Sequence, residues 1–377
     1  MKPLISTIDL LKLSSGDLLY LQVYKFIGKQ PGKKVYIQAN LHGAEIVGNE
    51  VIYQLIDFLI TLDESQIEGE IWLVPVCNPL GTNQRSHFFS TGRFNSYDGK
   101  NWNRIFWDYE KEFNELEIFA GNQVEYEVEE ISKNYLAKIK IAWQQELNKI
   151  KQPSSVPWDE QYRYHLQSLC LDANYVIDIH SSSNQAIDYL YCFQERQESA
   201  KYFLLEQGIL IDEYDGNSFD EAFLKPWLAL EKKLAQLGKK VTFDLESWTL
   251  ELGSGMQINP DSVIRGVSGI KNYLTYQGIL KLTENHSLQK VEINLVKKSQ
   301  IQDYYAPTGG MIRARIPLGS KIKRGDKLYQ ILSFNKQTKL PTVIEVCAET
   351  DGLVFDVATN QAVNQGEYVL GMMNANT

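Results

Sequence analysis

Two histidines and a glutamate stand where predicted strands end, in an arrangement suited to binding a metal ion. His42 and Glu45 lie in VYIQANLHGAEIVGNEV, at the seam between a β-favouring run and a helical one, and His180 ends a second run, YVIDIHSSS. Two imidazoles and a carboxylate that leave one coordination position open form the ligand set of a catalytic zinc rather than a structural one. Spacing alone is weaker support, because an acid three places after a histidine is common by chance and a lone histidine at a strand end is usually just hydrogen bonded.

Asp178 precedes His180 by two residues, so both side chains lie on the same side of the predicted strand. A carboxylate in this place can orient a metal-binding histidine from outside the coordination sphere. Packing at the edge of the core is the alternative, and the sequence does not separate the two.

The elements that would position these residues alternate between strands and helices. Short apolar strands are predicted within residues 33–42, 69–79, 173–183 and 239–254, and a helix with an apolar stripe within residues 43–62. This alternation predicts an α/β sheet with helices on both faces, in which ligands bind at the carboxyl ends of the strands.

Two further segments differ in character. Residues of about 107–165 are charged and amphipathic, which predicts a helical insertion packed beside the core; binding of a partner protein to these helices is the alternative. Residues 291–377 alternate in short runs broken by Gly, Asn and Asp, which predicts a small all-β domain after a 1–290 domain. The small domain resembles a barrel-sandwich module of the biotinyl/lipoyl type, but its hairpin reads FNKQTKLP and lacks the Met-Lys-Met loop, so a carrier role is not expected.

Five motifs occur in the order seen in the succinylglutamate desuccinylase/aspartoacylase family, the deacylase branch of the zinc carboxypeptidases. They are NLHGAE, NPLGTNQR, GRFNSYDGKNWNRIF, DIHSSS and TLELGS. The chain therefore resembles that family over residues of about 30–265 outside the insertion. The resemblance implies a zinc-carboxypeptidase-like mixed sheet flanked by helices, and the small C-terminal β-domain is shared by the family.

The resemblance also implies roles for single residues. His42, Glu45 and His180 would bind one Zn²⁺, and Glu251 in TLELGS would be the general base. Glu246 lies an odd number of residues away on the same strand and faces the other way.

Three further positions match the substrate-binding part of the family's pattern. Arg93 would stabilise the oxyanion, and Asn103 with Arg104 would hold a substrate carboxylate. Arg85 is a second candidate cation at the substrate site. The family's usual DLNR reads NWNR here, and this change bears on the shape of the pocket rather than on the carboxylate clamp.

These roles imply a zinc-dependent hydrolase that cleaves the amide bond of a small N-acyl amino acid or a related carboxylate-bearing compound. The alternatives are a metallocarboxypeptidase acting on peptide C-termini and a non-catalytic zinc- or ligand-binding homologue. The acyl group, the amino acid, the oligomeric state and any contribution of the C-terminal domain to the site stay open.

Composition narrows the partners. The 377 residues carry a formal charge of −9 spread along the chain, which argues against a nucleic-acid partner. No apolar run reaches the length of a membrane helix and no signal peptide is evident, so we expect a cytoplasmic protein without membrane association. The four cysteines show no metal-binding spacing and are predicted to be buried free thiols.

Overall fold

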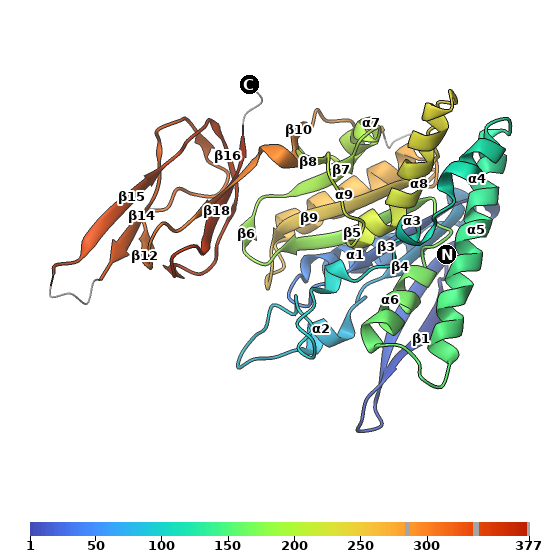
Figure 1. Cartoon of the computed structure of the whole chain (residues 1–377), viewed down its shortest axis with the longest axis horizontal. Helices are drawn as coiled ribbons and strands as arrows, with labels where there is room; N and C mark the ends of the chain where they lie inside the picture. The colour runs from blue at the N-terminus through green and yellow to red at the C-terminus, as the bar shows by residue number, and fades with distance from the viewer. Residues whose placement is uncertain (283–286, 335–338, 375–377) are drawn as a thin grey trace.

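The computed structural model describes residues 1–282, 287–334 and 339–374, and its largest element is a mixed β-sheet (Figure 1). Over these residues the large sheet has nine strands in the order β1-β2-β4-β3-β5-β9-β7-β8-β10. In chain order the strands are β1 (Leu4–Lys12), β2 (Leu18–Ile27), β3 (Gln30–Ala39), β4 (Glu68–Val74), β5 (Tyr175–Ser182), β7 (Tyr189–Phe193), β8 (Gln207–Ile211), β9 (Glu246–Ser254) and β10 (Asn294–Lys297). The predicted mixed α/β sheet is confirmed.

The middle of the large sheet is parallel. Strands β4, β3, β5 and β9 are neighbours that run in one direction, so their carboxyl ends meet at one edge. Alternation along β3 sends Val35 and Ile37 to one face and Tyr36 to the other, where each side chain is fully buried. Both faces are thus apolar, and both need helices to cover them.

One face is covered by α1 (Val47–Ile60) and α9 (Pro260–Tyr276), which contact each other and pack their apolar stripes against β3, β5 and β9. The predicted helix over residues 43–62 begins later, at Val47. Residues 43–46 instead form the turn that carries Glu45, so the first residues of the predicted helix are free to build the site.

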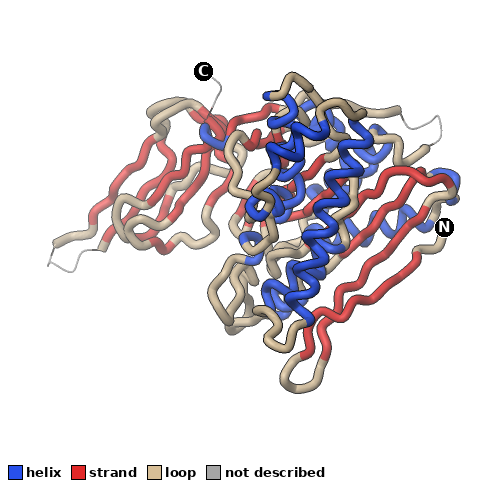
Figure 2. The backbone as a smooth tube through the Cα atoms, turned by 45° about the vertical axis from the view of Figure 1, so that its right-hand side comes forward, coloured by secondary structure: helices blue, strands red, loops and turns tan. Residues whose placement is uncertain are grey.

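The other face carries the predicted helical insertion together with α8 (Phe219–Gln236). The insertion contains α3 (Tyr109–Glu112), α4 (Leu116–Gln123), α5 (Val128–Lys151) and α6 (Trp158–Ser168). Buried side chains of α6 and α8 pack with Tyr36 of β3, and those of α5 pack with α8, so the insertion lies against the core (Figure 2). Trp102, predicted to bear on the shape of the pocket, is 2% exposed and packs on Trp158 and Tyr162 within this layer.

The C-terminal residues form two smaller sheets that lie at one end of the large sheet (Figure 1). Their strands are β11 (Ile301–Tyr305), β12 (Gly310–Arg313), β13 (Lys321–Ile322), β14 (Lys327–Ser333), β15 (Thr342–Cys347), β16 (Gly352–Val357), β17 (Ala362–Val363) and β18 (Tyr368–Asn374). Their apolar side chains pack between the sheets as a separate core.

Two strands qualify the predicted boundary at residue 290. The short β10 pairs with β8 in the large sheet, although the sequence placed residues 291–297 with the small domain. Strand β6 (Gln185–Ala186), which lies between β5 and β7 in the chain, pairs with β16 of the C-terminal sheets instead. The division into two folding units therefore stays a prediction, because each part of the chain contributes one strand to a sheet of the other part.

Two other expectations can be compared with the structure. Cys77, Cys170 and Cys192 are buried free thiols as predicted, but Cys347 lies on β15 and is exposed, so the prediction of burial is wrong there. The hairpin FNKQTKLP lies partly outside the described residues. Among the helices that are described, none has both the length and the apolar character to cross a lipid bilayer.

Candidate metal centre

The site lies at the edge where the parallel strands end. His180 of β5 and Glu251 of β9 are direct neighbours across the two strands, and His42 follows the end of β3 by three residues. Because the carboxyl ends of parallel strands meet, residues more than 200 positions apart are brought together here.

The turn after β3 is held by the side chain of Asn40 and by close packing at Gly43. Asn40 has a positive φ of 70°, and its Nδ2 donates to the carbonyls of His42, Gly43 and Glu45 at 3.2, 3.0 and 3.4 Å. At Gly43 an added Cβ would lie 1.9 Å from the carbonyl oxygen of Gly81, so only glycine fits. The turn therefore holds His42 and Glu45 on one side.

The predicted ligand atoms converge. Nδ1 of His42 lies 2.9 Å from Oε1 of Glu45, and Nδ1 of His180 lies 2.8 Å from Oε2 of the same carboxylate. The donor atoms of the three residues all lie within 4.8 Å of one another, and the side chains are at most 3% exposed. Two imidazoles and one carboxylate in this compact, buried arrangement fit a zinc ion with an open coordination position.

The second nitrogen of each imidazole, Nε2, also has a hydrogen-bond partner. Oδ2 of Asp178 lies 2.8 Å from Nε2 of His180, and Oδ1 of Asn101 lies 3.0 Å from Nε2 of His42. Each oxygen can accept the Nε2–H proton, so Nδ1, the nitrogen that faces Glu45, is the one that a metal ion would bind. Asp178 therefore occupies the orienting position considered from the sequence, and Asn101 has the same relation to His42.

Burial and neighbouring charges have opposite effects on the pKa values of these residues. Burial lowers the pKa of His42. Burial acts in the same direction on His180, but the carboxylates of Asp178 and Glu45 outweigh it and raise the His180 pKa well above its ordinary value. Burial alone would raise the pKa of Glu45, yet the two histidines lower it strongly. Glu45 is thus held as a carboxylate, the form that binds a cation.

Glu251 differs from the other acids of the site. Its Oε2 is buried and has no hydrogen-bond partner among the residues that the structure describes. Burial, reinforced by the charge of Glu45, raises the pKa of Glu251 to about 7, although His180 and Arg93 act against this. Glu251 lines a cavity together with His42 and His180, and an unpaired carboxylate oxygen is what a group that receives a proton from water requires. Glu246 instead bonds to Ser199, Trp248 and Tyr273, away from the cavity.

Arg93 reaches the ligand cluster from the loop before η2 (Trp102–Arg104). Its Nη1 donates to Oε1 of Glu45 at 3.3 Å and to Oγ of Ser183 at 3.4 Å, and its side chain is 36% exposed. The guanidinium therefore contacts Glu45 and lines the same cavity, while part of the side chain stays exposed.

The remaining predicted binding residues divide into two groups. Asn103 and Arg104 line the same cavity as His42, His180 and Glu251. Oδ1 of Asn103 accepts from the backbone N–H of Phe219 at 2.8 Å, which ties this segment to the start of α8. Arg85 is not among the residues that line the cavity, and its guanidinium donates to the carbonyls of Thr82 and Gln84.

Several cavity residues were not found from the sequence. They are Tyr191, Ile211, Ser218, Asp220, Glu221, Thr249 and Lys298. Thr249 could have been found, because it lies two residues before Glu251 on β9 and shares its face. The others come from β7, β8, the start of α8 and η4 (Lys298–Gln300), where no motif marks them. Asp220 accepts hydrogen bonds from Ser218 and Thr249 at 2.7 and 2.9 Å.

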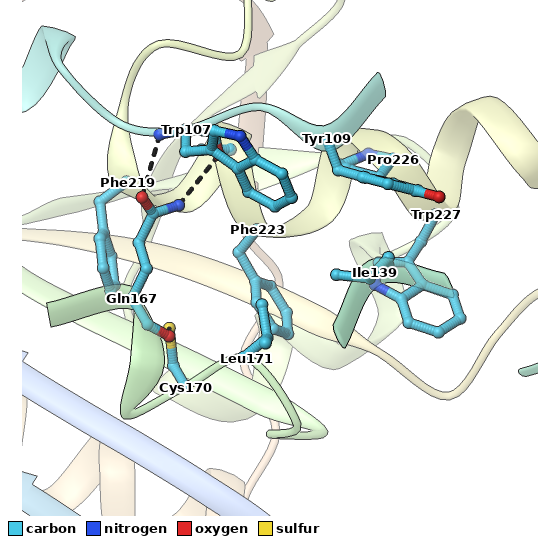
Figure 3. Close-up of a pocket in the computed structure, with 11 residues that line it drawn as sticks. Trp107, Tyr109, Ile139, Gln167, Cys170, Leu171, Phe219, Phe223, Pro226 and Trp227 are labelled. Atoms are coloured by element: carbon cyan, nitrogen blue, oxygen red, sulfur yellow. Dashed lines mark hydrogen bonds between the residues drawn. The ribbon is translucent and has the colours of Figure 1, made fainter. Parts of the chain in front are cut away.

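A second cavity lies inside the helical layer and is separate from this site (Figure 3). It is lined mainly by aromatic and aliphatic side chains, among them Trp107, Tyr109 and Trp227. Gln167 closes one side, where its amide accepts from the backbone N–H of Trp107 at 2.9 Å and donates to its carbonyl at 3.0 Å. No acidic, basic or histidine side chain is among the described residues that line it, so this cavity presents no catalytic constellation.

Comparisons with known proteins agree with the geometry. Residues 31–137 match the family model of the succinylglutamate desuccinylase/aspartoacylase catalytic domain. A protein of Shewanella amazonensis SB2B assigned to this family has 29% identity and a TM-score of 0.86, with 98% of each chain covered. A second such protein, of Shewanella frigidimarina NCIMB 400, has 25% identity and a TM-score of 0.88, with 99% of this chain and 97% of that chain covered.

A more distant likeness concerns the fold alone. The ectoine utilization protein EutE (DoeB) of Ruegeria pomeroyi has 16% identity and a TM-score of 0.69, with 100% of this chain and 96% of that chain covered. No curated protein matches this chain. The resemblance expected from the five motifs is confirmed, and it supports an enzyme of the deacylase kind.

Proposed function

Because residues 31–137 match the succinylglutamate desuccinylase/aspartoacylase catalytic domain, we propose that this chain is a zinc-dependent deacylase. Its substrate is a small N-acyl amino acid or a related compound with a carboxylate. The observation that carries the proposal is the convergence of Nδ1 of His42, Nδ1 of His180 and the Glu45 carboxylate. His42 and His180 share a cavity with Glu251, whose Oε2 has no hydrogen-bond partner among the described residues.

The residues would divide the work as follows. His42, Glu45 and His180 would hold the zinc ion, which would supply Lewis acidity toward a carbonyl oxygen and a water molecule. Glu251 takes the proton from the attacking water at its carboxylate and returns it to the nitrogen of the leaving amine as the amide bond breaks. Burial raises the pKa of Glu251 in the metal-free protein, and a carboxyl group that both takes up and releases a proton suits the two transfers.

Charge at the substrate is met by three further side chains. Arg93 donates to the oxygen that becomes negative when the amide carbonyl is attacked, and a fixed cation in a partly dry cleft stabilises that charge strongly. Asn103 and Arg104 hold the substrate carboxylate, for which a guanidinium offers two parallel donors. Arg85 lies outside the cavity lining, so we give it no role in this scheme.

The test is amine release from a panel of N-acyl amino acids by zinc-loaded protein, with Glu251→Gln as the matched control. The panel includes acetyl and succinyl compounds and peptides with free C-termini. Turnover of an acylated amino acid that disappears in the Gln variant supports the proposal and identifies the acyl group. Turnover of peptides alone favours a carboxypeptidase, and stoichiometric zinc with no turnover of any member favours a binding protein.

A further inference from the structure

The loop after His180 lies between the candidate metal centre and the C-terminal sheets. It comprises Ser181 and Ser182, which end β5, and Ser183 and Asn184, which lead to β6, and these four residues are called the loop below. Toward the metal centre, the backbone N–H of Ser181 and the hydroxyl of Ser183 each donate to Glu45 at 3.4 Å. Ser183 also accepts from Nη1 of Arg93 at 3.4 Å. Small shifts of this loop would therefore move groups that touch both Glu45 and Arg93.

The opposite side of the loop is held by one acid of the C-terminal sheets. Asp356 of β16 is 7% exposed, and it accepts hydrogen bonds from the Ser182 hydroxyl, from Nδ2 of Asn184 at 3.3 Å and from the Tyr368 hydroxyl at 2.8 Å. Three donors thus converge on its two oxygens. A carboxylate can serve them all because, when ionised, it accepts at both oxygens and donates at neither.

Backbone hydrogen bonds also connect the residues after the loop to the C-terminal sheets. Strands β6 and β16 pair with Ala186 opposite Asp356 and Gln185 opposite Val357, and the N–H of Ile187 donates to the carbonyl of Phe355 at 3.0 Å. Apolar side chains from both parts, including Tyr189 and Phe355, pack around it. The path of the loop is therefore set by the C-terminal sheets as well as by β5.

We propose that Asp356 is a positioning residue for the candidate metal centre. By fixing Ser182 and Asn184, it keeps Ser181 and Ser183 in place against Glu45 and Arg93. The catalytic part of this inference rests on the proposed function, whereas the metal-binding part does not. The competing explanation is that Asp356 only joins two sheets, in which case its loss lowers stability and leaves the properties of the folded protein unchanged.

The test compares Asp356→Asn with Tyr368→Phe in the full chain. The asparagine side chain has nearly the shape of aspartate but presents an NH₂ group where three donors converge, so at least one bond to the loop or to Tyr368 is lost. Tyr368→Phe removes a hydrogen bond to the same carboxylate from the C-terminal side and leaves both loop donors paired. The matched control thus perturbs Asp356 without freeing the loop.

Three quantities are measured: the Kd for zinc by competition with a chromophoric chelator, kcat with KM, and the melting temperature. For Asp356→Asn we expect zinc affinity and kcat to fall by roughly 10-fold each, the lower end of the range for residues behind metal ligands. KM should change less than about two-fold, because Asn103 and Arg104 lie on another segment. Tyr368→Phe should lower the melting temperature while zinc affinity and kcat stay within about two-fold of wild type.

A double-mutant cycle with Ser182→Ala tests the route. If Asp356 acts through the loop, the double variant should lose less than the sum of the two single losses, since both changes weaken the same connection between Asp356 and the loop. Fully additive losses, or an Asp356→Asn protein with unchanged zinc affinity and kcat but a lower melting temperature, would overturn the proposal. Wild-type protein that binds zinc without deacylating any substrate would instead refute the proposed function, and zinc affinity would still decide the role of Asp356.

Discussion

Oδ2 of Asp178 lies 2.8 Å from Nε2 of His180, on the edge of the ring opposite Glu45. The other oxygen of Asp178 is buried without a partner in the described part of the chain, so the carboxylate is committed to this one histidine. The His180 ring is thereby held with Nδ1 toward the candidate metal centre. Its orientation is already fixed in the metal-free protein.

Replacement of Asp178 by Asn should weaken zinc binding by roughly 10- to 100-fold, because the ring loses a charged acceptor that orients it and makes it more basic. Chelator competition measures the change directly. Asp172→Asn is the control, since Asp172 precedes the same strand but pairs with Lys34 and Lys140 at the surface. Equal affinity of both variants would show that Asp178 only packs at the core edge.

The free energy of unfolding of the metal-free protein should depend on pH because of Glu251. Burial raises the pKa of this group from 4.5 to about 7, so the folded protein keeps a proton that the unfolded chain has already lost. The contribution of Glu251 to stability is therefore greatest below the unfolded pKa and falls as the pH rises toward about 7. At 1.36 kcal/mol per pKa unit the full change is on the order of 3 kcal/mol.

Denaturant unfolding of chelator-treated wild type and Glu251→Gln between pH 4.5 and 8.5 tests this, with these limits being roughly the range over which the group titrates. The Gln variant should become the more stable of the two as the pH rises. Curves that stay parallel over the whole range would show that Glu251 titrates like an ordinary carboxyl group.

Arg104→Gln should raise KM for a substrate with a carboxylate by roughly 10-fold or more, because a neutral amide replaces the charged, two-pronged donor. The variant should show little change toward an N-acyl amine that lacks the carboxylate, since no partner is lost. Steady-state kinetics on the matched pair of substrates makes the comparison. Arg85→Gln provides a control, because Arg85 does not line the cavity. Similar losses on both substrates would place Arg104 outside the carboxylate clamp.

Removal of zinc should lower the melting temperature of the wild type. A ligand that binds only the folded state at about 100 times its Kd adds roughly 2.7 kcal/mol to the free energy of unfolding. Calorimetry before and after dialysis against a chelator gives the shift, and added zinc should restore it. His180→Ala should show a much smaller shift. A wild-type melting temperature that is indifferent to zinc would contradict the metal site.

The cluster of candidate metal ligands could be predicted from the sequence, because it depends on where recognisable strands end. His42, Glu45 and His180 follow apolar runs recognisable as strands, and parallel strands bring their carboxyl ends together. The helix start was misplaced for a local reason: Gly43 and Asn40 form a turn whose contacts with Gly81 and the following carbonyls are not visible in periodicity. The first strands, β1 and β2, were not predicted at all.

The residues around the candidate metal ligands could not be predicted from the sequence, because contacts between distant parts of the chain bring them there. Asn101 was expected to bear on pocket shape, but its Oδ1 lies at Nε2 of His42, 59 residues away. Lys298 and Asp220 belong to the cavity only because η4 and α8 pack beside β8 and β9. Asp356 lies 174 residues from Ser182 and follows no motif. Such partners are chosen by tertiary packing, which no window of sequence contains.

The pairing of β6 with β16 bears on how this chain can be shortened. If the chain ended before residue 300, Gln185 and Ala186 would lose their partner strand and Tyr189 would lose the cover of Phe355. An open strand edge beside apolar side chains is a template for association with other chains. A truncated protein is therefore expected to aggregate even though His42, Glu45 and His180 are all retained, so the last strands help to keep the folded chain from self-association.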